Sequence, residues 1–478
     1  MDRRSFLAAG VIGTGAIALQ MSGKSDVAAR TSETVTSIAG LQSAIDRATA
    51  GAQIVLANGT YAVPSGGIRI TGRNGTSTSP ITISAQTRGG VVLTGALSFV
   101  FSSSSNITIS GFSLRQSSTL DIPANCSRIR LTRNDIAFAA AASHCVVVRG
   151  NDAKIDRNTF RDKSSVGCYL VIDGPSGDQA NEMALRTHIL RNHFRDHSFS
   201  GENGGEPIRL GVSSRALGDA DATIEFNLFE RVNGDPEAIS VKASGSTIQY
   251  NTIRSSLGGI VLRHGNNNRV EGNYILSGDN GIRIYGNDQL IVNNYVGGVG
   301  SAGIVLGSGT VRDHYEGESS DSRRGNDAPD RVTIVLNTLR NNAQALAGES
   351  QRTLPPLACK ISDNLLVGDS GTLVSMPYTQ GLTWSGNIVW GGASTGNIPS
   401  SGYTRADPKL VAGTDGIYRL ASGSAAINKS SLDHSTRVTD DLDGHTRTAP
   451  YDVGADEYST LTPVRRPLTP ADVGPAAP

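Results

Sequence analysis

A short phrase repeats along most of the chain: an asparagine followed, two residues later, by an aliphatic or aromatic residue. Ten occurrences begin at Asn134, Asn158, Asn192, Asn227, Asn251, Asn273, Asn294, Asn337, Asn364 and Asn387, and an eleventh, NIT at Asn106, has its aliphatic residue one position earlier. The shorter spacings are 21 to 24 residues, and longer gaps, such as 294 to 337, contain polar, glycine-rich insertions. A period near 22 residues without a helical pattern is typical of a solenoid of stacked parallel strands.

We therefore predict an all-β fold, a single-domain right-handed parallel β-helix. The 56 glycines and the low aromatic content, 5%, agree with many short strands and turns. Rungs would stack about 4.8 Å apart, so asparagines at equivalent turns can bond along the stack as an amide ladder. Solenoid ends need covering, and Thr36-Ser37 before IAGLQSAIDRATAG predict an N-terminal capping helix that closes at Gly51.

The two ends of the chain lack the repeat. Arg3 and Arg4 precede an apolar run to about Met21 and small residues near 27–29, which predicts a twin-arginine signal peptide over residues 1–29. The run is short for a membrane span, although an uncleaved anchor is the alternative. The β-helix is expected over 30–457, followed by a proline-rich disordered tail over 458–478. The mature protein is expected in the periplasm or outside the cell, free of the membrane.

Charge and cysteine content exclude some classes of partner. The chain has 43 basic and 43 acidic residues, so global charge gives no argument for nucleic acid, and attraction for a charged partner must be local. The four cysteines, Cys126, Cys145, Cys168 and Cys359, form no C-x-x-C pair, which argues against zinc. We expect buried free thiols, with a disulfide in an oxidising compartment as the alternative.

Four strand-like segments each carry an outward basic residue. Because side chains alternate along a strand, inward aliphatic residues leave the cations outward at Arg209, Lys242, Arg263 and Arg283, with Tyr285 beside the last. We expect these cations to stack as one column, where mutual repulsion calls for a compensating anion. A solvated basic stripe is the alternative. A narrow cationic groove suits an extended polyanion such as a uronic-acid polysaccharide.

Two carboxylates precede Lys242 in GDPEAISVKAS, namely Asp235 and Glu237. Glu237 differs from Lys242 by an odd number of residues, so we expect it in the turn before the strand, where alternation breaks. With Asn203 or Glu206, these acids offer hard oxygen ligands suited to calcium. Salt bridges to neighbouring cations are the alternative.

A groove of this kind can support β-elimination on a uronate. Removing the weakly acidic C5 proton develops charge on the carboxylate, which a metal or a guanidinium stabilises. A lysine flanked by cations loses its own proton more readily and can act as the base. A neighbouring arginine stays charged, so it binds the carboxylate or assists the leaving group.

The chain resembles the chondroitinase B–like alginate lyases, polysaccharide lyase family six, over roughly residues 35–457. The resemblance rests on GENGGEPIRLG, NLFERVNGDPEAISVKAS, GGIVLRHGNNNRVEGNYI, NGIRIYG and the terminal GADE. It implies that Lys242 is the Brønsted base and Arg263 the catalytic acid. It also implies that Asn203, Asp235 and Glu237 hold a calcium ion against the substrate carboxylate. Glutamate is more usual in the family where this chain has Asp235, and some members need no calcium.

The expected function is cleavage of alginate to unsaturated oligosaccharides by a monomeric enzyme. We expect the anionic polysaccharide to contact Arg209, His264, Arg283 and Tyr285. The alternatives are a chondroitin B (dermatan sulfate) lyase, a non-catalytic polysaccharide-binding β-helix, and a hydrolase. A hydrolase needs two acids across the scissile bond, whereas the outward positions here are cationic.

Overall fold

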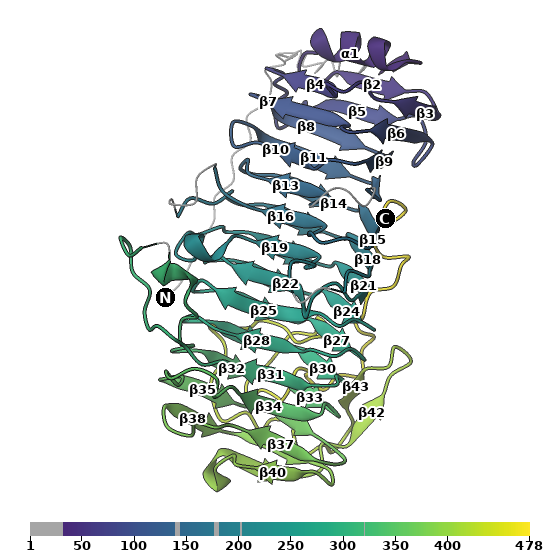
Figure 1. Cartoon of the computed structure of the whole chain (residues 1–478). Coiled ribbons are helices and arrows are strands. Elements are labelled where there is room, and N and C mark those ends of the chain that lie inside the picture. The colour runs from purple at the N-terminus through teal and green to yellow at the C-terminus, as the bar shows by residue number, and fades with distance from the viewer. Residues whose placement is uncertain (1–31, 139–143, 176–180, 201–202, 320) are drawn as a thin grey trace, which may run out of the picture.

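The computed structural model describes residues 32–138, 144–175, 181–200, 203–319 and 321–478. The chain coils into successive rungs that build three long sheets with parallel pairing (Figure 1). One 14-stranded sheet runs from β1 (Ser32–Val35) to β38 (Leu382–Ser385), and another from β3 (Gly59–Ala62) to β41 (Tyr403–Arg405). This architecture is the parallel β-helix that the repeat predicts. Among the described helices, none is long and apolar enough to cross a membrane.

The third sheet faces the viewer in Figure 1 and has 11 strands. In stacking order these are β10 (Leu120–Ile122), β13 (Val146–Val148), β16 (Leu170–Ile172), β19 (Ile208–Leu210), β22 (Glu237–Lys242), β25 (Gly259–His264), β28 (Ile282–Ile284), β31 (Ala302–Leu306), β34 (Gln344–Gly348), β37 (Thr372–Ser375) and β40 (Ser394–Gly396). Its inward isoleucines, such as Ile239 and Ile260, pair across rungs and are fully buried. The opposite face of these strands is therefore left to carry polar side chains.

A ladder of buried asparagines fixes the stacking of the rungs. The side-chain Nδ2 of each donates to Oδ1 of the next at 2.9–3.1 Å, from Asn134 through to Asn387. The predicted amide ladder is thus confirmed for ten of the eleven repeats. Asn106 is the exception, because it lies within β8 (Ser105–Ser110) and not at the turn that the ladder follows, and its Nδ2 donates to the Gly75 carbonyl. In the rung before Asn134, the backbone N–H of Phe112 donates to Oδ1 of Asn134 at 3.0 Å.

The N-terminal end of the solenoid is covered by α1 (Ile38–Asp46). Ser37 is its N-cap, and its hydroxyl accepts from the Gly40 N–H at 3.0 Å. The helix buries Leu41, Ala44 and Ile45 against the first rungs. The predicted cap is confirmed, although the helix ends five residues before Gly51. The predicted signal peptide, residues 1–29, lies outside the described residues.

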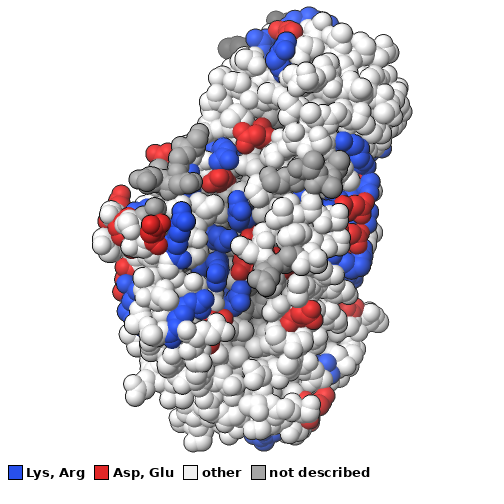
Figure 2. Space-filling view, in the orientation of Figure 1, with Lys and Arg blue, Asp and Glu red and all other residues white. Residues whose placement is uncertain are grey.

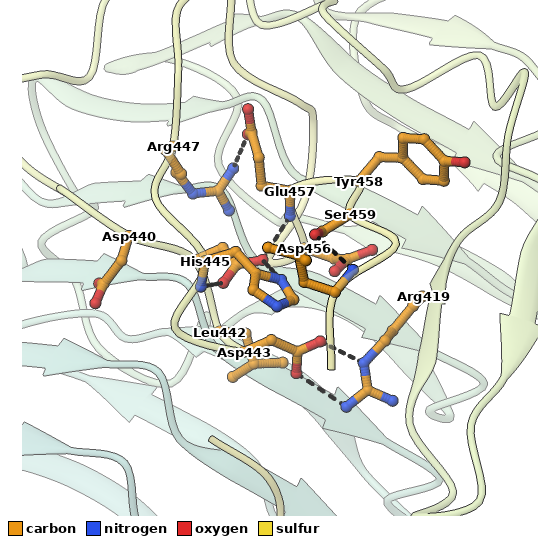
Figure 3. A network of polar contacts seen from close by, with 12 residues as sticks. Arg419, Asp440, Leu442, Asp443, His445, Arg447, Asp456, Glu457, Tyr458 and Ser459 are labelled. Atoms are coloured by element: carbon orange, nitrogen blue, oxygen red, sulfur yellow. Dashed lines mark hydrogen bonds and ion pairs between the residues drawn. The ribbon is translucent and has the colours of Figure 1, made fainter. Parts of the chain in front are cut away.

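The C-terminal segment returns along the outside of the solenoid. After the antiparallel pair β42 (Leu410–Ala412) and β43 (Tyr418–Leu420), it forms a polar network in which Asp443 binds Arg419 and Glu457 binds Arg447 (Figure 3). Val473 is 2% exposed, and the final carbonyl accepts from Arg157. This packing differs from the disordered tail that the proline content predicts, because apolar residues between the prolines find a flank to bury against.

All four cysteines are free and buried in the structure. Burial raises the pKa of the Cys145 thiol to about 12, which keeps it protonated. The preference for free thiols over a disulfide is confirmed.

Candidate active site

The outward cations of the 11-stranded sheet form two columns. Arg209 stacks on Ser240, and one rung further Val261 stacks on Arg283. The predicted single column is therefore wrong. Arg209 and Arg283 share the first outward position of their strands. Lys242 occupies the next outward position, two residues or about 7 Å further along the strand axis.

A β-bulge separates Arg263 from the regular pairing. Val241 pairs with Leu262, but Lys242 pairs with His264, so Arg263 is an extra residue in β25. Bulges re-aim a side chain and increase the local twist. Lys242 and Arg263 consequently lie on adjacent strands in the same region of the face. Figure 2 shows lysine and arginine side chains gathered in a hollow over the middle strands of this sheet, with acidic groups at its edge.

Lys242 rests on a buried carboxylate. Its Nζ lies 3.4 Å from Oε1 of Glu206, and the thiol of Cys168 lies 3.6 Å from the other oxygen. Burial alone would raise the pKa of Glu206, but Lys242 and Arg209 outweigh it and hold that pKa below its usual value. Glu206 therefore remains a carboxylate under the lysine.

Arg263 has no ion pair among the residues that the structure describes. Its guanidinium carbon lies 5.7 Å from the ring centroid of Tyr285, within reach of a cation–π interaction. A guanidinium that is held by a ring and not by a carboxylate keeps its N–H donors for an incoming anion.

Tyr285 is directed to this face, as predicted, but it is 1% exposed. Its hydroxyl donates to Oε2 of Glu349 at 2.7 Å. Burial and the nearby Glu349 raise its pKa, so the phenol stays protonated. The buried ring of Tyr285 thus packs against the arginines of the site. Tyr285 is not the exposed substrate contact that was expected.

His264 is also buried, at 2% exposure, in register with Lys242. Burial, together with the charges of Arg263 and Lys242, lowers its pKa to about 3. The imidazole is therefore neutral at physiological pH. Its buried Nδ1 has no hydrogen-bond partner in the described part of the chain, so the predicted substrate contact remains a proposal.

The predicted acids lie at the start of β22. Asp235 is in the preceding turn, where it accepts from the N–H groups of Gly204 at 3.0 Å and Glu237 at 3.1 Å. Burial and the charges of Glu206 and Glu237 raise the pKa of Asp235 to about 6. Glu237 is the first residue of β22 and pairs with Gly259, so the prediction that it lies in the preceding turn is wrong. The alternation breaks at a second bulge, between Glu237 and Ile239. It accepts from Nη2 of Arg283 at 3.1 Å.

The fit to calcium is one of donor chemistry. Asp235 and Glu237 supply carboxylate oxygens, the exposed Asn203 supplies an amide oxygen, and calcium takes such ligands. No group of three or more His, Cys, Asp or Glu side chains among the described residues is arranged to hold a metal.

Two residues of the site were missed by sequence reasoning. Glu349 and Arg352 follow β34, and Nη1 of Arg352 donates to Oε2 of Glu349 at 3.0 Å. They reach the site through Tyr285, whose ring centroid is 5.2 Å from the Arg352 guanidinium carbon. The alternation of LAG near 346–348 predicts the strand, but the long insertion before it hides the register.

Residues 35–303 match the sequence model of the chondroitinase B family. The chain belongs to this family. The matched region contains both cationic columns, the acids and Tyr285, but neither Glu349 nor Arg352. No sequence among curated proteins matches the chain.

Several solved structures share the fold of this family member. The family-six alginate lyase AlyGC is 23% identical with a TM-score of 0.72, covering 92% of this chain and 60% of its own length. A mannuronic acid-specific family-six lyase from human gut microbiota is 22% identical, with a TM-score of 0.67 and coverage of 78% and 90%. A family-six alginate lyase in complex with a trisaccharide is 21% identical, with a TM-score of 0.65 and coverage of 90% and 96%. This chain thus spans less than two thirds of AlyGC.

Proposed function

We propose that this family member is a polysaccharide lyase that cleaves alginate by β-elimination. The observation that carries the proposal is the bulge in β25, which sets an amine, Lys242, beside a guanidinium without an ion pair among the described residues, Arg263. The surrounding cations provide a binding surface for a polyanion. Alginate is preferred to dermatan sulfate because the solved structures of the same fold include alginate lyases.

The elimination uses these two side chains in different roles. The neutral amine of Lys242 takes the C5 proton, and the C–H electron pair becomes the C4–C5 double bond. The bond from C4 to the glycosidic oxygen breaks, and Arg263, as the catalytic acid, hydrogen-bonds the leaving oxygen and passes it a proton that the guanidine recovers at once from water. The products are an unsaturated sugar at one new end and a free hydroxyl at the other.

The remaining residues bind and orient. In this proposal Arg209 and Arg283, which share the other column, bind uronate carboxylates along the chain. His264 stays neutral, so it can donate or accept a single hydrogen bond to a sugar hydroxyl without adding charge. A calcium ion held by Asn203, Asp235 and Glu237 would supply further positive charge to the reacting carboxylate when bound.

The enzymatic test is release of unsaturated product, followed by ultraviolet absorbance, from alginate, dermatan sulfate and pectate under one condition. We expect the fastest release from alginate. Faster release from dermatan sulfate would make that polymer the substrate and leave the proposed mechanism unchanged. No product from any polymer would favour a non-catalytic binding protein. Lys242→Ala and Arg263→Ala should each lower kcat by on the order of 1,000-fold or more.

Calcium is tested separately from turnover. Metal analysis of the purified protein and the thermal midpoint with and without added calcium report binding directly. We expect chelation to lower both the midpoint and the activity, and Asp235→Asn with Glu237→Gln to abolish the shift. A midpoint and activity unmoved by exhaustive chelation would make these acids structural.

We also propose export by the twin-arginine segment and action as a monomer in the periplasm or outside the cell. Replacing Arg3 and Arg4 by lysine should retain the protein in the cytoplasm. Light scattering of the purified protein measures its mass. Export that continues after the replacement would refute the twin-arginine route, and a dimeric mass would refute the monomer.

A further inference from the structure

Next to the proposed catalytic pair, Tyr285 meets three residues from beyond the matched region, Gly307, Glu349 and Arg352. The strand registers align Ile284 with Leu306 and Leu306 with Gly348. The residues that follow these partners are Tyr285, Gly307 and Glu349, so they succeed one another on three consecutive rungs.

Gly307 makes room for the tyrosine ring. A Cβ at this position would lie 2.3 Å from a ring carbon of Tyr285, closer than real contacts allow. The backbone of Gly307 is not in the left-handed region, so the requirement here is space. Because the ring lies over this glycine, the Tyr285 hydroxyl reaches Glu349, two rungs away.

Arg352 is fixed at the far end of this arrangement. Its backbone N–H donates to the Ser308 hydroxyl at 3.2 Å, and its carbonyl accepts from the Tyr378 hydroxyl at 3.0 Å. Its Nη1 donates to Glu349 at 3.0 Å and to the Tyr285 hydroxyl at 3.4 Å. The side chain is still 19% exposed, so part of it is open to solvent.

The charge balance around the ring favours an anion. Three guanidinium carbons, those of Arg263, Arg283 and Arg352, lie 5.7, 6.0 and 5.2 Å from the Tyr285 centroid. Glu349 pairs with Arg352, and Glu237 with Arg283, so the one net positive charge among the described residues of this cluster is that of Arg263. Arg352 offers N–H donors as well, because only Nη1 of its guanidinium donates to described residues. Converging cations of this kind are stabilised by a carboxylate ligand, which a guanidinium can bind through two N–H groups.

We propose that Arg352, held by Glu349 and Tyr285, binds a second uronate carboxylate of the same substrate chain, on a sugar other than the reacting one. This inference rests on the proposed function and names a specificity-determining residue of that site. The residue binds a sugar away from the reacting bond, so it acts mainly on substrate affinity and on the length of chain that is cleaved well.

The test compares Arg352→Ala with the unchanged protein on alginate oligosaccharides of increasing length. A lost charge-assisted pair should raise KM by about 10-fold or more on long chains, with kcat changed less than about threefold. The effect should vanish on the shortest oligosaccharide cleaved. Arg352→Lys should restore part of the affinity. Arg331→Ala is the matched control, because that arginine pairs with Asp288 away from this cluster.

Two further variants test the residues that hold Arg352 in position without removing any arginine charge. Gly307→Ala should displace the Tyr285 ring and weaken long-chain binding while leaving every guanidinium present. Tyr285→Phe keeps the ring but removes the hydroxyl that donates a hydrogen bond to Glu349. Its effect on long-chain binding should therefore be smaller than that of Gly307→Ala. A wild-type thermal midpoint in each variant separates these effects from misfolding.

Binding by calorimetry, in the Lys242→Ala background, gives a readout that does not need turnover. Weaker binding of a long alginate oligosaccharide on adding Arg352→Ala supports the inference even if no polymer is cleaved. Equal affinity with and without Arg352, together with an unchanged KM, overturns it. A fall in kcat at constant KM on all lengths also overturns it, since Arg352 would then act on the reacting sugar.

Discussion

The ammonium of Lys242 lies 3.4 Å from Oε1 of Glu206, a carboxylate whose side chain is 2% exposed. The residue that we propose as the base is therefore paired with a buried negative charge. This pair holds the lysine side chain at the outward face of the sheet.

Glu206→Gln should shift the pH dependence of kcat/KM. Glu206→Gln removes a negative charge 3.4 Å from Nζ of Lys242, so the acidic limb of the profile is expected to move to lower pH. The measurement is kcat/KM on alginate from pH 5 to 10. Glu225→Gln, on another sheet and paired with His188, is the control. A profile that keeps its position while kcat falls would show that Glu206 only orients the lysine.

Lys242→Ala should also cost stability, because Glu206 then remains buried without its partner. We expect a loss on the order of 2 kcal/mol in the free energy of unfolding. The double variant Lys242→Ala/Glu206→Gln should recover most of it, as measured by urea unfolding, and should stay inactive. An inactive but fully stable single variant would mean that Arg209 alone compensates Glu206.

Arg283→Ala should raise KM for long chains more than it lowers kcat. Arg283 lies one rung beyond Arg263 and in the other column, and it is held by Glu237. Initial rates over a range of alginate lengths separate the two constants. Arg283→Lys, which keeps the charge, is the comparison. A large loss of kcat at constant KM would instead place Arg283 in the reacting group.

Breaking the asparagine ladder should destabilise the whole solenoid. Asn251 is 0% exposed, accepts from Asn227 and donates to Asn273 and to the Ile224 carbonyl. Asn251→Ala leaves these buried groups without partners, at a cost of about 2–4 kcal/mol. Asn106→Gly, which keeps the positive φ of a repeat outside the ladder, should cost less than about 1 kcal/mol. Equal losses in urea unfolding would contradict a special role for the ladder.

The C-terminal network should make stability depend on pH (Figure 3). Burial, and then Asp441 and Asp443, raise the pKa of Asp456 from 3.8 to about 7. A raised carboxyl pKa stabilises the fold fully below pH 4, and this contribution is lost as the pH rises through 7. Asp456→Asn keeps an acceptor for the Leu420 N–H, so its thermal midpoint at pH 9 should exceed the wild-type value by about 1–3 °C. An equal gain in the exposed Asp321→Asn would refute the assignment.

Much of the fold was predictable because it repeats. The period of the asparagine phrase gave the rung length, and alternation in AISVK and GIRIY assigned inward and outward faces correctly. The column was mispredicted because Arg209 and Lys242 occupy successive outward positions, a difference that parity does not detect. The extra residue at Arg263 is a local departure from a pattern that is regular on both sides.

The site residues that lie in one short sequence motif were predictable. Those that reach the site only through contacts between distant rungs were not. Lys242, Arg263, Asp235 and Glu237 stand close in sequence, so their proximity follows from one rung period. Arg352 enters from a strand that follows the insertion between Asn294 and Asn337, and only the register of β31 with β34 brings it near Tyr285.

The ladder of asparagines has a consequence for how this molecule can change. Neighbouring members are 21 residues apart at Asn273 and Asn294 but 43 apart at Asn294 and Asn337, with the same bond between them. Length is therefore free to vary between two fixed points without disturbing the rungs on either side. Segments inserted between two ladder positions are therefore exchangeable, so a segment from a relative with another polymer preference can be transplanted here without changing the rungs.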